Sequence, residues 1–202
     1  MLGKTELLEA ISSTNRGLLA SEADQQTIQM LVTRLEEQTP TSDPLSEREQ
    51  LEGIWRLLYT TSRELLGIDR FPLYKLGQIY QCIYLSERRI YNVAEILGLP
   101  YLEGLVSVSA QFEAVSQNRV SVGFERGVFG LQRALGYETP ASFIEKLQAE
   151  DSLPFWQGID FRINRDRQSG WLEVTYLDKD LRIGRGNQGN IFVLCKVSTA
   201  TA

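Results

Sequence analysis

The chain has 202 residues, 43% of them hydrophobic, and a formal net charge of −5. That length is enough to bury a full core, so we expect a soluble globular protein of one domain, or one domain with an appendage. Because the net charge is negative, the protein as a whole does not attract nucleic acid phosphates electrostatically. We therefore do not expect nucleic acid as a partner.

Histidine is absent. This excludes Ser-His-Asp and Cys-His nucleophilic systems and histidine-ligated metals. Carboxylate, lysine or tyrosine chemistry stays open, but no motif marks it. The sequence therefore marks no catalytic, metal or cofactor site.

Two cysteines, Cys82 and Cys195, are too few for a disulfide framework and fit a reducing compartment. Glu6 and Glu9 interrupt the apolar residues of the N-terminus, which argues against a signal or transit peptide. No apolar run approaches the roughly 20 residues that span a bilayer. We expect the protein to work in the compartment where it is made, unless a leader has been removed.

Residues 1–45 are expected to form a helical segment. Apolar residues recur there at helical spacing, and Ser21 with Asp24 has the S-x-x-D form that caps a helix N-terminus. We interpret this segment as packed on the main domain, residues 46–202, while a docking surface for a protein partner is the alternative.

Beyond residue 52 the spacing of the apolar residues changes from the helical period of about 3.6 residues to the strand period of about 2 residues. We expect a mainly β fold with N-terminal helices, in which roughly eight or nine short strands form an antiparallel β-barrel. Such a barrel is just wide enough to hold one small ligand or to be filled by its own side chains. The strands are expected at residues 54–60, 78–85, 89–96, 105–115, 119–125, 158–164, 171–177, 180–185 and 190–197.

The clearest alternation of apolar and polar residues begins at residue 105 and continues past a turn at Gln117 and Asn118. We interpret its apolar face as the lining of a ligand cavity, although a self-filled barrel stays open. The lining residues are Val106, Val108, Ala110, Phe112, Val120, Val122 and Phe124.

Two expected loops, residues 62–75 and 127–137, are unusually apolar. Exposed apolar patches mark ligand mouths, partner sites or membrane surfaces. We expect these loops to gate the barrel mouth and dock it on a lipid surface; folding as short helices over the open end is the alternative. The residues concerned are Leu65, Leu66, Phe71, Tyr74, Val128, Phe129 and Leu131.

Residues 184–189 spell G-x-G-x-x-G, the letters of a dinucleotide-binding turn. That motif works only where a strand passes into a helix, and here a β-branched and aromatic run follows. We therefore expect a hairpin turn in which Gly186, Asn187 and Gly189 supply positive φ.

Three segments carry a family resemblance: LEGIWRLLYT at 51–60, WLEVTYLDKDLRIGRGN at 171–187, and FVL at 192–194. They resemble the plastid lipid-associated protein (PAP)/fibrillin family of plants, algae and cyanobacteria. The resemblance implies a lipocalin-like barrel, without catalytic residues, that is peripherally associated with thylakoid membranes or lipid globules such as plastoglobules.

Members of this family are thought to bind or shelter isoprenoids, carotenoids, quinones or fatty acids, as carrier or structural proteins. The lack of a transit peptide suggests a cyanobacterial member at the cytoplasmic side of the thylakoid, or a plastid protein if a transit peptide was removed. We therefore expect a non-enzymatic protein with an apolar lipid or isoprenoid ligand.

In a closed barrel the first strand pairs with the last, so Trp55 can meet a cation from the closing hairpin. Arg182 and Arg185 lie on opposite faces of one strand, so one can stack on the indole while the other binds a ligand head group. Asp178 and Asp180 are expected to hold the same arginines.

Two other functions stay open. Bilin lyases of photosynthetic bacteria also use lipocalin-like barrels, and an acidic residue such as Glu173 could serve such a lyase or chaperone. The N-terminal helices could instead make the chain a scaffold for a prenyl-lipid biosynthetic enzyme.

Overall fold

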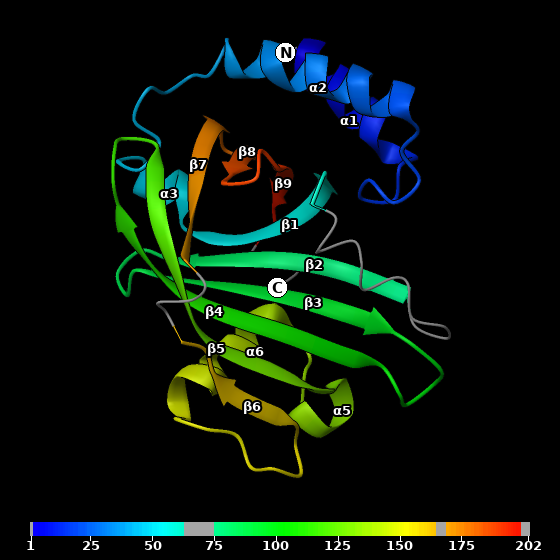
Figure 1. The fold of residues 1–202 in the computed structure, drawn as a ribbon, viewed down its shortest axis with the longest axis vertical. Coiled ribbons are helices and arrows are strands. Elements are labelled where there is room, and N and C mark those ends of the chain that lie inside the picture. The colour runs from blue at the N-terminus through cyan, green and yellow to red at the C-terminus, as the bar shows by residue number, and fades with distance from the viewer. Residues whose placement is uncertain (1, 63–74, 165–168, 199–202) are drawn as a thin grey trace.

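A computed structural model describes residues 2–62, 75–164 and 169–198 (Figure 1). Nine strands dominate it, and in chain order they are β1 (Gly53–Thr60), β2 (Lys75–Tyr84), β3 (Arg89–Leu97), β4 (Gly104–Ala114), β5 (Arg119–Leu131), β6 (Ile159–Arg162), β7 (Ser169–Leu177), β8 (Leu181–Gly186) and β9 (Ile191–Lys196). The helices are α1 (Leu2–Ser12), α2 (Glu22–Glu36), α3 (Arg48–Leu51), α5 (Gln132–Leu135) and α6 (Pro140–Ala149).

Eight of the strands close into an antiparallel barrel. The order is β4-β3-β2-β1-β9-β8-β7-β5, and β4 pairs with β5 to complete the ring, while β6 extends the sheet beside β5. The first strand pairs with the last, with Trp55 opposite Lys196. The expected mainly β fold, a barrel with N-terminal helices, is confirmed.

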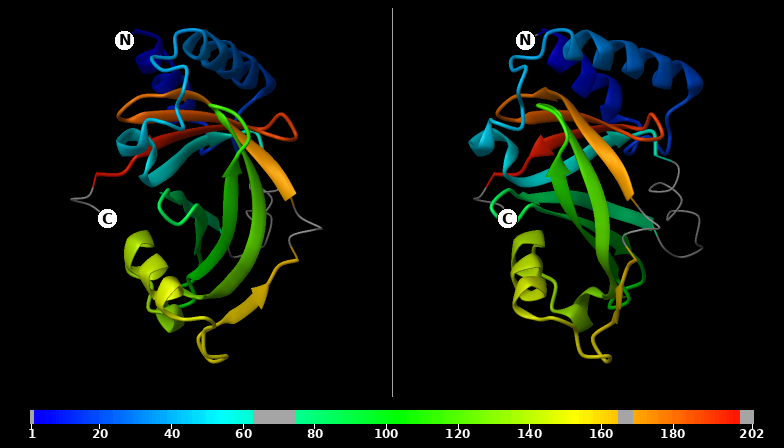
Figure 2. Two further views of the ribbon diagram at one scale, coloured as in Figure 1. Left: turned by 90° about the vertical axis from the view of Figure 1, so that its left-hand side faces the viewer. Right: turned by 60° about the vertical axis from the view of Figure 1, so that its left-hand side comes forward.

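The two N-terminal helices cover the outer face of β8 and β9 (Figure 2). Ser21 caps α2 and exchanges hydrogen bonds with Asp24, as the sequence predicts. Ile28, Val32 and Leu35 of α2 pack against outward-facing strand residues such as Ile183. Burial of these side chains against the barrel holds the helical segment in place.

One end of the barrel is closed by the segment around α3. Gly53 has a φ of +121°, which lets the chain turn sharply from α3 into β1 and favours glycine at this position. The indole Nε1 of Trp55 then donates to the carbonyl of Leu51 at 2.9 Å. Leu51 and Leu45 pack beneath the inner side chains, so this end is sealed.

The strand β5 is longer than the sequence predicts. Residues 127–131 were expected in an apolar loop, but they pair with β4 as far as Leu131, and only Gln132–Leu135 forms a short helix. A bulge between Ser109 and Ala110 changes the register and keeps both halves of the hairpin paired. Pairing with β6 stabilises this extension of β5. The spacing of apolar residues in the sequence does not reveal that pairing.

The helix α6 packs on the outer face of β2, β3 and β4, opposite the N-terminal helices (Figure 1). The buried Arg126 of β5 connects β6 to α6. Its Nε and Nη2 donate to Asp160 at 2.9 and 2.6 Å, and its Nη1 donates to the carbonyls of Leu147 and Glu150. The guanidinium therefore binds β6 and the C-terminal end of α6 at once.

The G-x-G-x-x-G segment forms the hairpin between β8 and β9, as expected. One detail differs from the prediction. Gly189 has a φ of +72°, but Gly186 belongs to β8 and neither it nor Asn187 adopts positive φ. A single glycine is enough because Gly189 N donates to Gly186 O and closes the turn.

Candidate functional site

In one region of the barrel interior the side chains are buried and packed against one another. Apolar side chains from α3, β1, β2, β3, β7 and β9 meet there, and we call them the inner cluster. Its buried members are Leu51, Trp55, Leu57, Leu76, Ile79, Ile83, Ile90, Ala94, Val174, Leu177 and Leu194. This region resembles an ordinary protein core.

The inner face of β4 and β5 is different. All seven residues expected to line a cavity share this face, because Ala110 pairs with Phe124 and Phe112 pairs with Val122. Ala110 and Val120 are buried, while five keep partial access to solvent: Val106, Val108, Phe112, Val122 and Phe124. Val106 and Phe112 also pack against the inner cluster. This face is therefore less completely buried than the inner cluster.

A chain of polar side chains adjoins this face. Asn92 pairs with Val108 across β3 and β4, and Gln81 pairs with Asn92 across β2 and β3. The Gln81 Nε2 donates to Asn92 Oδ1 at 3.0 Å, and Gln81 Oε1 accepts from Arg182 Nη2 at 2.5 Å. Gln81 and Asn92 are both half-buried.

Arg182 ends this polar chain inside the barrel. Its cross-strand neighbours Leu177 and Leu194 belong to the inner cluster, and its side chain is 2% exposed. The guanidinium carbon lies 5.0 Å from the Trp55 ring centroid, so Arg182 makes the cation–π contact expected of one closing arginine. Burial lowers the pKa of Arg182 to about 9.

The guanidinium of Arg182 is hydrogen-bonded only in part by the residues that the structure describes. Within the described ranges, its Nε and Nη1 are buried without a hydrogen-bond partner. Lys196 is a second cation close by, with Nζ 5.4 Å from the Trp55 centroid. That ammonium donates to the carbonyls of Glu49 and Gln50, and desolvation followed by repulsion from Arg182 lowers the pKa of Lys196.

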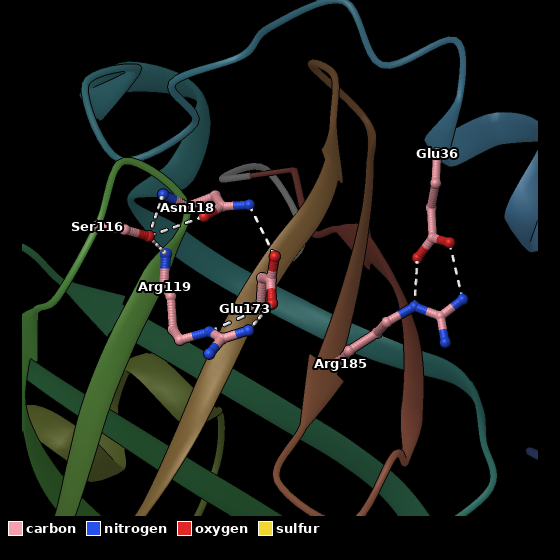
Figure 3. A network of polar contacts seen from close by, with 6 residues as sticks. All are labelled: Glu36, Ser116, Asn118, Arg119, Glu173 and Arg185. Atoms are coloured by element: carbon pink, nitrogen blue, oxygen red, sulfur yellow. Dashed lines mark hydrogen bonds and ion pairs between the residues drawn. The ribbon is translucent and has the colours of Figure 1, made fainter.

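Arg185 points the other way, toward α2 (Figure 3). Its Nε and Nη2 form a two-point ion pair with Glu36 at 2.8 and 2.7 Å. This pair ties β8 to the N-terminal helices, so Arg185 has a structural partner outside the barrel.

The aspartates do not hold the arginines, contrary to expectation. Asp178 instead accepts from Lys4 at 2.8 Å and from the Tyr176 hydroxyl at 2.8 Å, and Asp180 lies 3.6 Å from the same lysine. The turn between β7 and β8 directs both carboxylates toward α1. Burial would raise the pKa of Asp178, but the hydrogen bonds from Lys4 and neighbouring groups lower it on balance.

Glu173, the acidic residue considered for bilin chemistry, has both carboxylate oxygens occupied (Figure 3). Asn118 donates to Oε1 at 2.8 Å, and Arg119 donates to Oε2 at 2.7 Å. The same arginine stacks on Trp171. This network joins the β4–β5 turn to β7.

The residues expected at the mouth fall into three groups. Phe129 and Leu131 are 48% and 41% exposed at the end of β5. Val128, between them, faces the opposite side and is buried against the cluster around α6. The third group, Leu65, Leu66, Phe71 and Tyr74, lies outside the described residues.

Sequence reasoning missed an exposed apolar group beside Phe129. Ile159 of β6 pairs with Phe129, and Phe161 lies two residues further along. Phe155 and Trp156, in the loop before β6, are 88% and 69% exposed and stack edge to face. Two adjacent large aromatics after Pro154 were a visible signal. The inward position of Gln81 was visible from strand parity, but its contact with Arg182 was not.

Among the described residues no group of histidine, cysteine and carboxylate side chains is arranged to hold a metal. In the same residues, Cys82 and Cys195 are free thiols. No helix in the described ranges combines the length and apolarity needed to cross a membrane.

Comparison with known proteins gives a consistent result. A family model described as PAP_fibrillin matches residues 1–195. The probable plastid-lipid-associated protein 2 of Arabidopsis thaliana, a chloroplast protein, is 31% identical over 217 residues, covering 96% of this chain and 70% of the relative. A chromoplast-specific carotenoid-associated protein of Cucumis sativus is 32% identical, covering 96% of the chain and 67% of the relative.

The chloroplast plastoglobulin-1 of Pisum sativum is 32% identical, covering 96% of this chain and 60% of the relative. No solved structure matches the chain.

Proposed function

Because the chain belongs to the PAP_fibrillin family, we propose that it is a non-enzymatic carrier or structural protein whose barrel holds the apolar part of an isoprenoid or acyl lipid. The accessible inner face of β4 and β5 carries this proposal. A fully packed barrel would bury all of these side chains, but Val106, Val108 and Phe124 keep contact with solvent. The names of similar proteins, one carotenoid-associated and another lipid-associated, support this class of ligand.

A lipid surface is the proposed source of the ligand. The exposed group of Phe129, Ile159, Phe161, Phe155 and Trp156 lies on β5, β6 and the preceding loop, at the end of the molecule opposite α1 and α2 (Figure 1). Tryptophan and phenylalanine are favoured where protein meets the boundary of a lipid layer. We assign this group to docking on a thylakoid bilayer or a lipid globule, within a plastid or a cyanobacterial cell.

Lipid extraction of the purified protein followed by mass spectrometry tests the carrier function. Isoprenoid or acyl lipids should be recovered in constant proportion to protein. Protein that is repeatedly empty, and that also fails to float with phosphatidylcholine vesicles, would contradict the proposal.

The docking assignment is tested by replacing Phe155 and Trp156 together with serine. Because each large exposed apolar side chain contributes about 1.5–3 kcal/mol when buried in an apolar phase, the floated fraction should fall by at least about tenfold. The control is Met30→Ser, which removes an equally exposed apolar side chain from α2 at the other end. Equal flotation of all three proteins would refute this docking surface.

A further inference from the structure

Arg182 has more hydrogen-bonding capacity than the barrel uses. Its side chain is 2% exposed, one nitrogen donates to the neutral amide of Gln81, and Nε and Nη1 have no partner among the residues that the structure describes. The contact with the Trp55 ring supplies no hydrogen-bond acceptor in the plane of the guanidinium, so the remaining N–H groups still require acceptors. A buried charge without an anionic partner is costly to keep.

The charges around Arg182 favour an anion. Lys196 lies over the same indole ring, and its hydrogen bonds go to the main-chain carbonyls of Glu49 and Gln50. Neither cation forms an ion pair with a carboxylate in the part of the chain that the structure describes. Among the described residues the hydrogen bonds of both cations therefore go to neutral acceptors, and Glu52 attracts Lys196 without forming an ion pair, inside a protein whose net charge is −5.

The polar chain connects this charge to the accessible lining. Val108 is a half-buried lining residue, Asn92 pairs with it, and Gln81 bridges Asn92 and Arg182. An apolar chain lying along β4 would thus end beside a bridging amide with the guanidinium directly behind it.

From these contacts we propose that the barrel recognises an anionic head group, a carboxylate or phosphate monoester, on a single apolar chain that enters head-first. The inference rests on the proposed function and narrows its ligand class. The amide oxygen of Gln81 stands in for one anion oxygen at Nη2. On binding, the anion takes that position and accepts a second hydrogen bond from a free nitrogen of Arg182, while Gln81 turns toward Asn92.

Competitive displacement of the neutral fluorescent probe N-phenylnaphthylamine tests the proposal. The competitors are hexadecanoic acid, hexadecyl phosphate and hexadecanol, which share one chain and differ in head group. At about pH 8 the acid is ionised, so an acid or phosphate should displace the probe at about tenfold lower concentration than the alcohol. Comparing acid with phosphate identifies which anionic head is preferred.

Arg182→Met should remove this preference and leave hexadecanol binding unchanged. Arg185→Met is the matched control, because it removes an arginine on the same strand that points outward to Glu36. It should keep the wild-type preference. If Arg182→Met does not fold, the wild-type protein still tests the proposal, through the ratio of the hexadecanoic acid and hexadecanol concentrations that displace the probe.

The outcomes separate the two proposals. Equal displacement by acid, phosphate and alcohol in the wild type would overturn head-group recognition and leave lipid binding standing. A preference that survives in Arg182→Met would also overturn it. Failure of the probe and of every competitor to bind would instead contradict the proposed function itself.

Discussion

Two buried arginines in the same barrel differ in what surrounds them. Arg126, 8% exposed, makes a two-point pair with Asp160 and donates to two carbonyls at the end of α6. Within the described part of the chain, Arg182, 2% exposed, donates once, to a neutral amide. The first has the partners that a buried charge requires in a stable fold, and the second does not.

The comparison separates a structural charge from a functional one. Arg126 joins β5, β6 and α6, so its removal breaks contacts between elements. Arg182 lies beside the inner face of β4 and β5, and its unused donors match an acceptor that the described residues do not supply.

The largest effect is expected from Arg126→Met. Removing one partner of a buried ion pair leaves Asp160 desolvated and two carbonyls without a donor, which costs about 3–5 kcal/mol. Urea unfolding followed by circular dichroism should show this loss in the free energy of unfolding. A loss below about 1 kcal/mol would mean that Arg126 is not the structural member of the pair.

Acid should weaken the same contact. Burial tends to raise the pKa of Asp160, but hydrogen bonds from Arg126 and Leu153 N outweigh it and lower the pKa. The stabilisation is thus complete above the ordinary aspartate pKa of about 3.9 and is lost as pH falls through the lower folded-state value.

Asp160→Asn tests this dependence. The variant should be less stable than the wild type at neutral pH, and the difference should shrink as the pH falls from about 3.9 through the lower folded-state pKa, where first the unfolded and then the folded wild-type carboxyl becomes protonated. Urea unfolding of both proteins across this range measures it. A difference that stays constant with pH would show that the carboxylate charge does not matter.

The smallest effect on stability is expected from Arg182→Met. The lost cation–π contact, worth about 0.5–2 kcal/mol, is offset by relief of the buried guanidinium, so the free energy of unfolding should change by less than about 1 kcal/mol. The same urea titration measures it. A loss as large as that of Arg126→Met would make Arg182 a structural seal.

The sequence predicted the fold well because its signals are local. Strand alternation, the cap at Ser21 and the turn at Gly189 each depend on a few neighbouring residues. The long β5 was missed because its second half is stabilised by β6, whose pairing residues lie about 30 positions away, a separation that no local period reports.

The candidate site was predicted only in part, because several of its contacts also join residues that lie far apart in the sequence. Parity showed that Arg182 and Arg185 point to opposite faces, but not which face carries the ligand space. The partners of Arg185, Asp178 and Asp180 lie in α1 and α2, far away in sequence, so they could not be assigned. The role of Gln81 depends on its contact with Arg182, which forms only when barrel closure brings the inner faces of β2 and β8 close together.

The central claim, that an apolar chain lies in the barrel with its head at the closed end, can be measured directly. With Trp156→Phe and Trp171→Phe, Trp55 is the remaining indole, and it lies 5.0 Å from the Arg182 guanidinium carbon. Bromine quenches indole fluorescence at short range. Hexadecanoic acid brominated beside the carboxylate should therefore quench Trp55 more strongly than the same acid brominated at the far end. Equal absence of quenching, or the reverse order, would contradict the account.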